Sequence, residues 1–508
     1  MNIRERLDQN MYIRLQQNID EIDLILGAPS DLQKKEFIIG DLNLDAALIY
    51  LNEMVNDTVI DKSILAPLIG KQLDKHLSNH EERECPSLSE LAKSKIYASV
   101  KKEVQTFQEA IDSILNGDTV LLLDQCEHAV VLSTSGGTKR SIDEPQTEPV
   151  IRGPRDGFVE SIGVNIALVR RRIKDPMLRM QSMNIGQRSK TSVAIAYIEG
   201  IVKDGLVDEV LERLKRIKID AILESGYIEE LIDDAPTSPF ITVQGTERPD
   251  KVASGIYEGR VAIFVDNTPF VLLVPTHFWQ FLDASDDHYS HYWMGTFFRI
   301  IRYLAFMISL SLPSLYVMLI RFHQEMLPTP LAITIAAGRE VVPLPVVLEA
   351  LVMEFAFELM REAGLRMPKP IGQAVSIVGS LIIGQAAVEA GLVSPAMVII
   401  VATTGIASFV IPNYAASFSV RLLRFPLLLA SGALGLLGFS VVFVVLLIHA
   451  ISLRSFGEPY LSPVMPLNST ELKDSLLRAP LWTLDERPST AKGDERREGD
   501  NQKPSPKR

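Results

Sequence analysis

The sequence predicts a multi-domain protein in which two cytoplasmic α/β subdomains precede a C-terminal polytopic α-helical membrane domain. Four charge-free runs predict the membrane domain, because each is about long enough to cross a hydrocarbon core, roughly 20 helical residues. The runs are 303–320, 371–388, 390–420 and 425–448. Strand-like and helix-like patterns alternate through residues 1–290, which is typical of layered α/β or α+β folds.

Residues 1–150 are expected to form the first subdomain. An amphipathic helix is predicted over 3–26, where apolar residues recur every three to four positions, and Ala28-Pro29-Ser30 ends it. Short apolar runs predict strands at 36–42, 119–123 and 128–134. Longer periodic stretches predict helices at 63–78 and 87–116.

Residues 151–290 are expected to form the second subdomain. A helix is predicted over 160–174, because Asp175-Pro176 stops it. The remaining patterns predict five strands and two helices. The strands are 178–185, 191–197, 241–244, 261–265 and 270–274, and the helices are 204–216 and 225–231. Asp266-Asn267-Thr268 between the last two strands is typical of a hairpin turn.

Residues 291–455 are expected to cross the membrane four or five times. The predicted spans are 297–320, 341–360, 371–388, 395–411 and 425–451. The second contains Glu349, Glu354 and Glu358, so it either spans or lies at the interface. In the last, three glycines recur every third residue, which indicates packing or a bend. They are Gly432, Gly435 and Gly438.

Basic residues flank three of these spans and predict their orientation. Five spans with a cytoplasmic N-terminus place all three clusters inside, as the positive-inside rule requires, and leave the C-terminus outside. With four spans instead, the C-terminal tail lies inside the cell, but two of the basic loops lie outside. The clusters are Arg299 and Arg302; Arg361, Arg366 and Lys369; and Arg421 and Arg424. The N-terminus lacks an apolar signal-peptide core, so we expect the soluble part to stay in the cytoplasm.

Residues 456–508 are expected to form a C-terminal tail that is largely disordered, because its end is rich in charge and poor in apolar residues. The net charge of −12 argues against a nucleic-acid partner.

Several long motifs resemble the GerA family of spore germination proteins, specifically the A subunit of nutrient germinant receptors. The resemblance covers roughly residues 110–465. The motifs are RGPRDGF at 152–158, NIALVRRRIKDPMLR at 165–179, KTSVAIAYIEGI at 190–201, GTERPDKVASGIYEGRVAIFVDNTPFVLLVP at 245–275, RFHQEMLPTPLAITIAAGRE at 321–340, GQAVSIVGSLIIGQAAVEAG at 372–391 and TTGIASFVIPNYAASFSVRLLRFP at 403–426.

The resemblance implies a multi-pass protein of the inner spore membrane that works with a transporter-like B subunit and a lipoprotein C subunit. Such receptors sense amino acids, sugars or nucleosides and trigger ion release and germination. The family's A subunit is expected to be a homo-oligomer that forms a nutrient-gated cation channel.

Small residues recur every fourth position in the span 371–388. This spacing permits close helix packing. In a second interpretation, small and polar side chains line a narrow pore between protomers, and apolar neighbours gate it by dewetting. The candidate pore and gate residues are Gln373, Val375, Ser376, Ile377, Val378, Ser380 and Gln385.

The three glutamates of the second span allow two interpretations. A lipid-facing carboxylate is costly, so they should face protein, water or the interface. Glu349, Glu354 and Glu358 either form a vestibule that attracts cations, or lie on an interfacial helix, solvated or paired with Arg361.

Seven residues in the family motifs of the soluble part, all charged except one proline, are expected to be structural. They are Arg152, Pro154, Arg155, Glu247, Arg248, Glu258 and Arg260. Arginines at 152, 155 and 170–172 either bind a carboxylate or phosphate ligand, or form ion pairs that fix the subdomain junction, with Arg155 the leading candidate for such a pair.

The sequence does not predict an enzymatic activity. It contains no nucleophile elbow, catalytic triad signature or dinucleotide fingerprint, and its histidines lack metal-ligand spacing. We therefore expect no catalytic residue, cofactor or metal. A channel-forming subunit, a non-conducting scaffold for the B and C subunits and a secondary transporter remain as hypotheses, and the lack of inverted repeats argues against the transporter.

Overall fold

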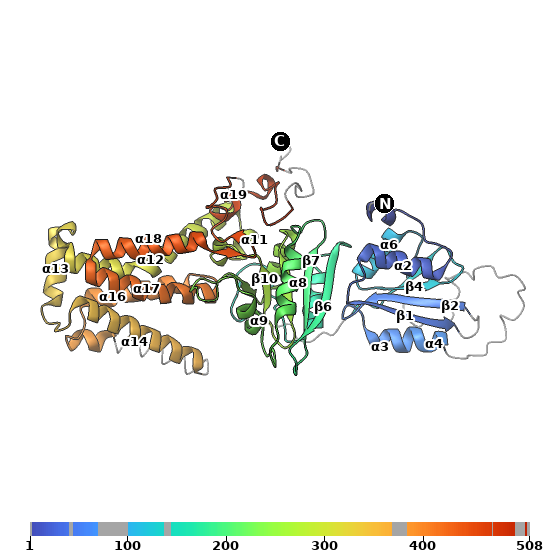
Figure 1. Cartoon of the computed structure of the whole chain (residues 1–508), viewed down its shortest axis with the longest axis horizontal. Coiled ribbons are helices and arrows are strands. Elements are labelled where there is room, and N and C mark those ends of the chain that lie inside the picture. Colours follow the sequence, from blue (N-terminus) through green and yellow to red (C-terminus); the bar gives the residue numbers. More distant parts are fainter. Residues whose placement is uncertain are drawn as a thin grey trace, which may run out of the picture.

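The computed structural model describes residues 3–39, 44–69, 100–136, 144–367, 384–469, 471–492 and 503–504. The chain is elongated, with the first subdomain at one end, the second subdomain in the middle and the helical domain at the other end (Figure 1). The predicted fold class is confirmed, with one refinement: the strands of both five-stranded sheets pair antiparallel.

The first subdomain is a sheet covered by helices on both faces. Strand order is β1-β2-β4-β5-β3. The strands are β1 (Leu32–Ile39), β2 (Leu44–Leu51), β3 (Val100–Val104), β4 (Thr119–Leu123) and β5 (Ala129–Leu132). The helices are α1 (Ile3–Leu7), α2 (Leu15–Leu26), α3 (Asp57–Val59), the π-helix Ile60–Leu65, α4 (Ala66–Ile69) and α6 (Phe107–Leu115).

Alternation along β2 shows why its residues are almost all apolar. Ala47, Ile49 and Leu51 face the core under α2 and α6, whereas Leu48 and Tyr50 face the core on the opposite side. A strand buried on both faces needs apolar residues at every position.

Two helix predictions in this subdomain differ from the structure. The helix expected over 3–26 is divided into α1 and α2, because the Asn18 side chain binds both backbone polar groups of Tyr12 and interrupts the ladder. The helix expected over 87–116 contains strand β3, and α6 begins at Phe107 with Thr106 as its N-cap.

The second subdomain repeats the same plan with strand order β6-β7-β9-β10-β8. The strands are β6 (Leu178–Ile185), β7 (Thr191–Ile198), β8 (Gln244–Thr246), β9 (Val261–Val265) and β10 (Val271–Val274). Helices α7 (Ile162–Arg170) and α10 (Pro249–Tyr257) cover one face, and α8 (Leu206–Arg216) and α9 (Ser225–Ile232) cover the other. The predicted hairpin is present, with Asn267 at φ 68° in its turn.

The helical domain begins with α12 (Tyr292–Phe322), which follows the 3₁₀ turn Phe278–Phe281 and the short α11 (Asp286–Tyr289). The other helices are α13 (Thr329–Arg339), α14 (Val346–Arg366), α16 (Pro395–Phe409), α17 (Tyr414–Leu434) and α18 (Leu436–Ser452). Among the described residues, α12 and α17 are long and apolar enough to cross a membrane, and α16 and α18 are shorter apolar helices.

The single span predicted over 425–451 is wrong, because the chain reverses direction within it. Helix α17 ends at Leu434, Gly435 adopts φ 63° and ψ −137°, and α18 packs back along α17 (Figure 1). A side chain at Gly438 would overlap the Ala430 carbonyl, and one at Gly432 would overlap Val347. The glycine pattern therefore marks both a bend and close packing, the alternatives that the sequence offered.

The C-terminal segment, residues 453–492, differs from the disordered tail that the sequence predicted. It forms β11 (Arg454–Ser455), β12 (Glu458–Pro459), α19 (Leu472–Ser475) and a 3₁₀ turn at Leu481–Thr483. Phe456 and Ala491 enter the two cores of the second subdomain, and Tyr460 is 2% exposed. Helix α18 thus returns the chain to the side from which α12 departs. A few buried apolar side chains hold the C-terminal segment, which is otherwise polar, on the soluble part.

A buried ion pair joins the two soluble subdomains. Arg170 on α7 donates to both carboxylate oxygens of Asp31, at 2.8 and 2.9 Å, and the two side chains are 1% and 9% exposed. Arg155, the residue predicted to make this junction, instead lies 3.1 Å from Glu144 with both side chains exposed. The interpretation of motif arginines as junction ion pairs is thus confirmed for Arg170 and wrong for Arg155.

We predict that Arg170→Ala will loosen the subdomain junction, because it leaves Asp31 buried without its partner. Breaking a buried pair costs about 3–5 kcal/mol, which raises the population of the opened junction by at least roughly 100-fold. Hydrogen exchange of the full-length protein should show faster exchange in α7 and in residues 27–32. Arg155→Ala is the matched control and should leave exchange unchanged, since exposed pairs contribute about 0–1 kcal/mol. Equal exchange in both variants would contradict the assignment.

Candidate functional site at the junction of the soluble and helical domains

Two buried arginines at the start of α12 anchor the helix to the soluble part. Arg299 Nε lies 3.2 Å from Asp287 Oδ2, and another of its guanidinium nitrogens lies 2.7 Å from Asp283. Arg302 pairs with Asp287 and donates to the Leu282 carbonyl at 2.7 Å. Arg299 and Arg302 were expected to be juxtamembrane basic residues, and the structure shows that aspartates of the preceding loop neutralise them.

His288 extends this cluster towards the soluble domain. Its Nε2 lies 3.2 Å from Asp283 Oδ2. Burial alone would lower the pKa of His288, but the negative charges of Asp283 and Asp474 outweigh it, and the pKa is raised. Burial would raise the pKa of Asp283, yet Arg299 and His288 lower it overall. The groups thus hold one another in their charged forms.

The C-terminal segment completes the cluster on the third side. Arg299 donates to the Asp474 carbonyl, and Tyr303 donates to the Ser475 carbonyl. Thr296 and Arg478 exchange two hydrogen bonds, each 3.2 Å long. The loop before α12, the base of α12 and the C-terminal segment therefore meet at one partly buried charged cluster, in which Asp287, Arg299 and Arg302 are buried. It is named here the junction cluster: Asp283, Asp287, His288, Arg299, Arg302 and Asp474.

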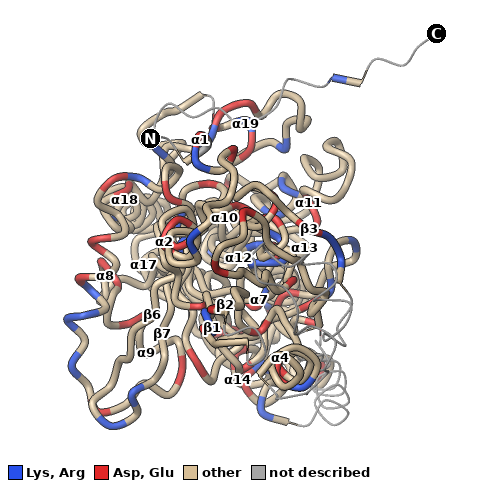
Figure 2. The backbone as a smooth tube through the Cα atoms, turned by 90° about the vertical axis from the view of Figure 1, so that its right-hand side faces the viewer, with Lys and Arg blue, Asp and Glu red and all other residues tan. Residues whose placement is uncertain are grey.

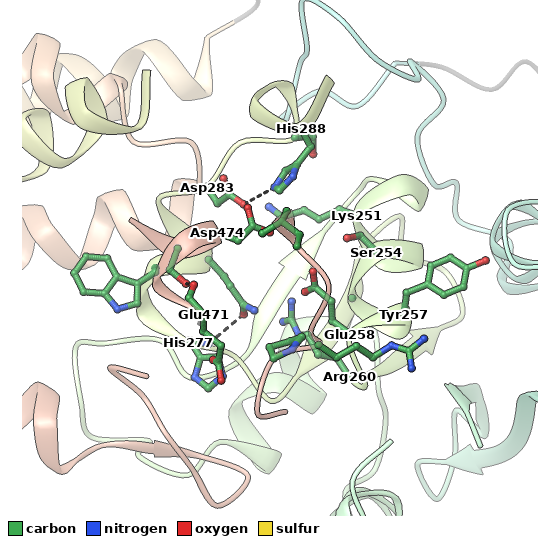
Figure 3. A pocket seen from close by; sticks show the side chains of 18 of the residues that line it. Lys251, Ser254, Tyr257, Glu258, Arg260, His277, Asp283, His288, Glu471 and Asp474 are labelled. Carbon is green, nitrogen blue, oxygen red and sulfur yellow. Dashed lines mark hydrogen bonds and ion pairs between the residues drawn. The ribbon is translucent and has the colours of Figure 1, made fainter. Parts of the chain in front are cut away.

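A cavity of about 780 Å³ lies beside the junction cluster. Its wall comes from α10, the loop 275–289 and the C-terminal segment (Figure 3). In Figure 3, His288, Asp283 and Asp474 lie at one side, Lys251 and Tyr257 at another, and His277 beside Glu471 at a third. The cavity separates the second sheet from the segment that returns from the helical domain.

The family-motif residues fasten the linker 144–158 to the second subdomain. Arg248 pairs with Asp250 at 2.7 Å and donates to the Glu148 and Pro154 carbonyls. The Glu247 carboxylate accepts from the backbone of Gln146 and Thr147.

Three other motif residues lie near the cavity or the junction. Arg260 is 3% exposed and donates to the carbonyls of Leu273 and Pro275. The backbone of Arg152 donates to Asp286, and Glu258 lines the cavity. All the contacts named for these motif residues are internal ones that hold the fold.

Each candidate glutamate of α14 is paired with an arginine of another segment. Glu354 pairs with Arg424 of α17, and the two side chains are 1% and 2% exposed. Glu358 lies 2.6 Å from Arg421 of the same helix. These pairs run in opposite order along the two helices, so α14 and α17 are antiparallel.

Glu349 and Arg361 also contact other segments of the helical domain. Glu349 lies 3.4 Å from Arg339 and accepts two hydrogen bonds from Ser394. Arg361, which was considered as a partner for these glutamates, instead donates to Ser408 Oγ at 2.5 Å and lies over the rings of Phe357 and Phe409. The carboxylates are thus neither solvated on an interfacial face nor paired with Arg361.

Most of the candidate pore residues lie outside the described residues, namely Gln373, Val375, Ser376, Ile377, Val378 and Ser380. Gln385 is described: it is exposed and donates to Glu389 at 2.9 Å, one helical turn further on. No group of three or more potential metal ligands occurs within the described part of the chain.

Sequence reasoning missed the aspartates of the junction cluster. The signal was present as an acidic run, DASDD at 283–287, that precedes the basic pattern RIIR at 299–302. Complementary charges on the two sides of a helix start indicate a buried cluster. Figure 2 shows acidic and basic residues interspersed along the described backbone.

We predict that the Glu354–Arg424 pair specifies the packing of α14 on α17. Glu354→Leu leaves Arg424 buried without a counter-charge and should cost about 3–5 kcal/mol, whereas the double variant with Arg424→Leu should recover most of that loss. Thermal unfolding in detergent and abundance in the membrane measure the stability of the single variant and of the double variant. Exposed Glu362→Leu is the control, and additive effects of the two buried substitutions would contradict the pairing.

The fold and the junction cluster together define a class of protein, in which a partly buried charged cluster holds a soluble region of two subdomains to helices of membrane-spanning length. The model of the Bacillus/Clostridium GerA spore germination protein family matches residues 20–490. The chain therefore belongs to the GerA family, the A subunits of spore germinant receptors.

Two relatives illustrate this membership, and one solved structure is also similar to the chain. The chain is 45% identical to spore germination protein KA of Bacillus subtilis, covering 97% of this chain and 89% of that protein. It is 38% identical to spore germination protein GerLA of Bacillus cereus, covering 95% and 96%. The crystal structure of the N-terminal domain of the A subunit of the Bacillus megaterium germinant receptor GerK3 matches with 36% identity and a TM-score of 0.42, over 54% of this chain and 99% of that one.

Proposed function

We propose that this chain is the A subunit of a nutrient germinant receptor in the inner spore membrane, and that it oligomerises into a nutrient-gated cation channel. In this proposal the soluble region lies in the cytoplasm, and the receptor includes a transporter-like B subunit and a lipoprotein C subunit. The observation that carries it is the junction cluster, because a displacement of the soluble domain or of the C-terminal segment acts directly on the base of α12.

Exposed apolar surface supports a multi-pass membrane domain that contacts lipid and other subunits. Helix α12 exposes Phe297, Ile301 and Leu304, and α18 exposes Val445 and Ile448. Helix α18 has 17 residues, so it is about 25 Å long and close to the thickness of a hydrocarbon core.

One observation favours the alternative, a non-conducting scaffold that organises the B and C subunits. The three glutamates that were candidates for a cation vestibule are neutralised by arginines. A conducting path would then have to rely on polar and small side chains such as Gln373, Ser376 and Ser380 rather than on carboxylates.

Transmission through the junction cluster predicts that Asp287→Asn will separate nutrient sensing from the response. The substitution removes the charge that both Arg299 and Arg302 contact, and leaves a buried positive excess. Spores carrying it should contain folded A subunit but germinate at least tenfold more slowly. Asp286→Asn is the matched control, since the hydrogen bonds of the Asp286 side chain among the described residues come from the backbone amides of residues 151 and 152. Equal germination rates in the two variants would argue against transmission through the cluster.

The channel and scaffold hypotheses are separated by substitutions in 371–388. Shrinking Val375, Ile377 or Val378 to alanine removes roughly 1–3 kcal/mol of packing or dewetting preference. That is enough to change a closed-to-open ratio about tenfold or more, so the channel hypothesis predicts leaky, nutrient-independent germination.

Bulkier residues at Ser376 or Ser380 should block the response while the protein remains in the membrane. Spore germination without nutrient and A-subunit abundance are the two measurements. If every substitution along this span changed germination only in proportion to A-subunit abundance, the scaffold hypothesis would be supported and the channel hypothesis would be rejected.

A further inference from the structure

Arg361, near the end of α14, is not neutralised by an ion pair within the described part of the chain. Its guanidinium donates one hydrogen bond there, to Ser408 Oγ at 2.5 Å, and its Nε is buried without a partner. The guanidinium carbon lies 5.4 Å from the centroid of the Phe357 ring and 4.3 Å from that of the Phe409 ring. The ion pairs of α14 involve other residues: Glu349–Arg339, Glu354–Arg424, Glu358–Arg421 and Glu362–Arg366.

The charges around Arg361 do not balance. Arg421 and Arg424 of α17 lie near enough for their charges to act on Arg361, and so does Glu358. Glu358 already pairs with Arg421 at 2.6 Å, and Glu354 already pairs with Arg424. Among the described residues of this helix pair, three neighbouring arginines therefore meet two carboxylates, and one positive charge is left over. A surplus charge in a low-dielectric environment favours the binding of an anion.

The position of Arg361 indicates which anions can reach it. Phe409, which it contacts, ends α16, and Ile411 packs in one apolar cluster with Leu282 of the loop before α12. Arg361 therefore lies at the end of the helical domain that adjoins the soluble region, and α14 ends five residues beyond it (Figure 1). In a bilayer, the head groups of one leaflet lie at this end of the helices.

The surface around Arg361 is apolar and aromatic. Phe409 of α16 and Leu359 of α14 are exposed, as are Tyr414 and Phe418, over whose rings Arg421 lies. Tyrosine is enriched where acyl chains meet head groups, and arginine side chains reach towards the head groups at that level. An anion that carries its own acyl chains matches both the apolar surface and the surplus charge.

We propose that Arg361 binds the phosphate of an anionic phospholipid in the leaflet next to the soluble region. Arg361 is half-buried, so a head group can approach it from the lipid side. Phosphate supplies a full counter-charge and several acceptor oxygens for a planar guanidinium. The inference rests on the proposed position of the helical domain in a bilayer, and it requires neither conduction nor oligomerisation.

The test is thermal unfolding of the full-length protein in detergent, followed by tryptophan fluorescence. Dioctanoyl phosphatidylglycerol, dioctanoyl phosphatidylcholine and inorganic phosphate are titrated separately. We expect phosphatidylglycerol to raise the unfolding temperature, because a ligand of the folded state stabilises it. Phosphatidylcholine carries a cancelling positive charge and inorganic phosphate lacks acyl chains. Each should therefore need at least about tenfold higher concentration for the same shift.

Three variants locate the effect. Arg361→Ala should raise the phosphatidylglycerol concentration for half the shift about tenfold, because it removes a charge-assisted hydrogen bond. Arg366→Ala is the matched control and should leave that concentration unchanged, since Arg366 is exposed on the same helix end and paired with Glu362. Arg361→Lys keeps the charge but loses the planar donors, so it should fall between the two, and it serves as the test if Arg361→Ala does not fold.

Three results would overturn the proposal. Equal responses of the parent protein to the two phospholipids would show that no anionic lipid is selected. An unchanged response in both Arg361 variants would mean that a carboxylate balances the charge, either Glu358 or one from another subunit. Equal losses in Arg361→Ala and Arg366→Ala would indicate diffuse attraction to the whole helix end.

A separate measurement tests the membrane position on which the proposal rests. The parent protein and Arg361→Ala should both float with vesicles of phosphatidylcholine and phosphatidylglycerol, because the exposed apolar helices enter the bilayer without this one contact. Failure of the parent protein to float would refute the proposed function itself, whereas flotation with no lipid selectivity would refute the Arg361 site alone.

Discussion

The structure depends on the buried charge at the base of α12. Arg299 and Arg302 enter a low-dielectric environment that would exclude them without counter-charges. Asp283, in the loop before the helix, and Asp287, on the short α11, supply those charges. Because the carbonyl of Asp474 binds the same Arg299, the C-terminal segment is held to the same point. A single electrostatic requirement thus sets how the soluble region, the first long helix and the end of the chain are joined.

The same requirement recurs inside the helical domain. Each arginine that enters the packed region from α17 meets a glutamate of α14, and Arg424 also donates to the Ser309 carbonyl on α12. Apolar side chains would pack there in many registers, whereas charged pairs tolerate one. In this account the pairs specify which helices meet, and the Gly435 turn lets α18 return beside α17.

The return of α18 gives the cavity its place in the molecule. One wall belongs to the sheet of the second subdomain, and the other belongs to a segment that arrives from the helical domain. The junction cluster lies at the edge of the same space, as Asp283, His288 and Asp474 line it. The cavity wall and the base of α12 therefore share residues of the junction cluster.

The sequence by itself determined the features that local periodicity encodes: the apolar helices, the strands of the second sheet, the hairpin at Asn267 and the family motifs. Tertiary structure alone decided the partners of the charges. Arg170 finds Asp31 across 139 positions and Arg424 finds Glu354 across 70, and no local pattern names either partner. The tertiary structure also decided that the C-terminal segment packs on the second subdomain. From the sequence alone, its few apolar residues do not predict a packed structure. Phe456 and Ala491 suffice because they complete cores that other segments have already built.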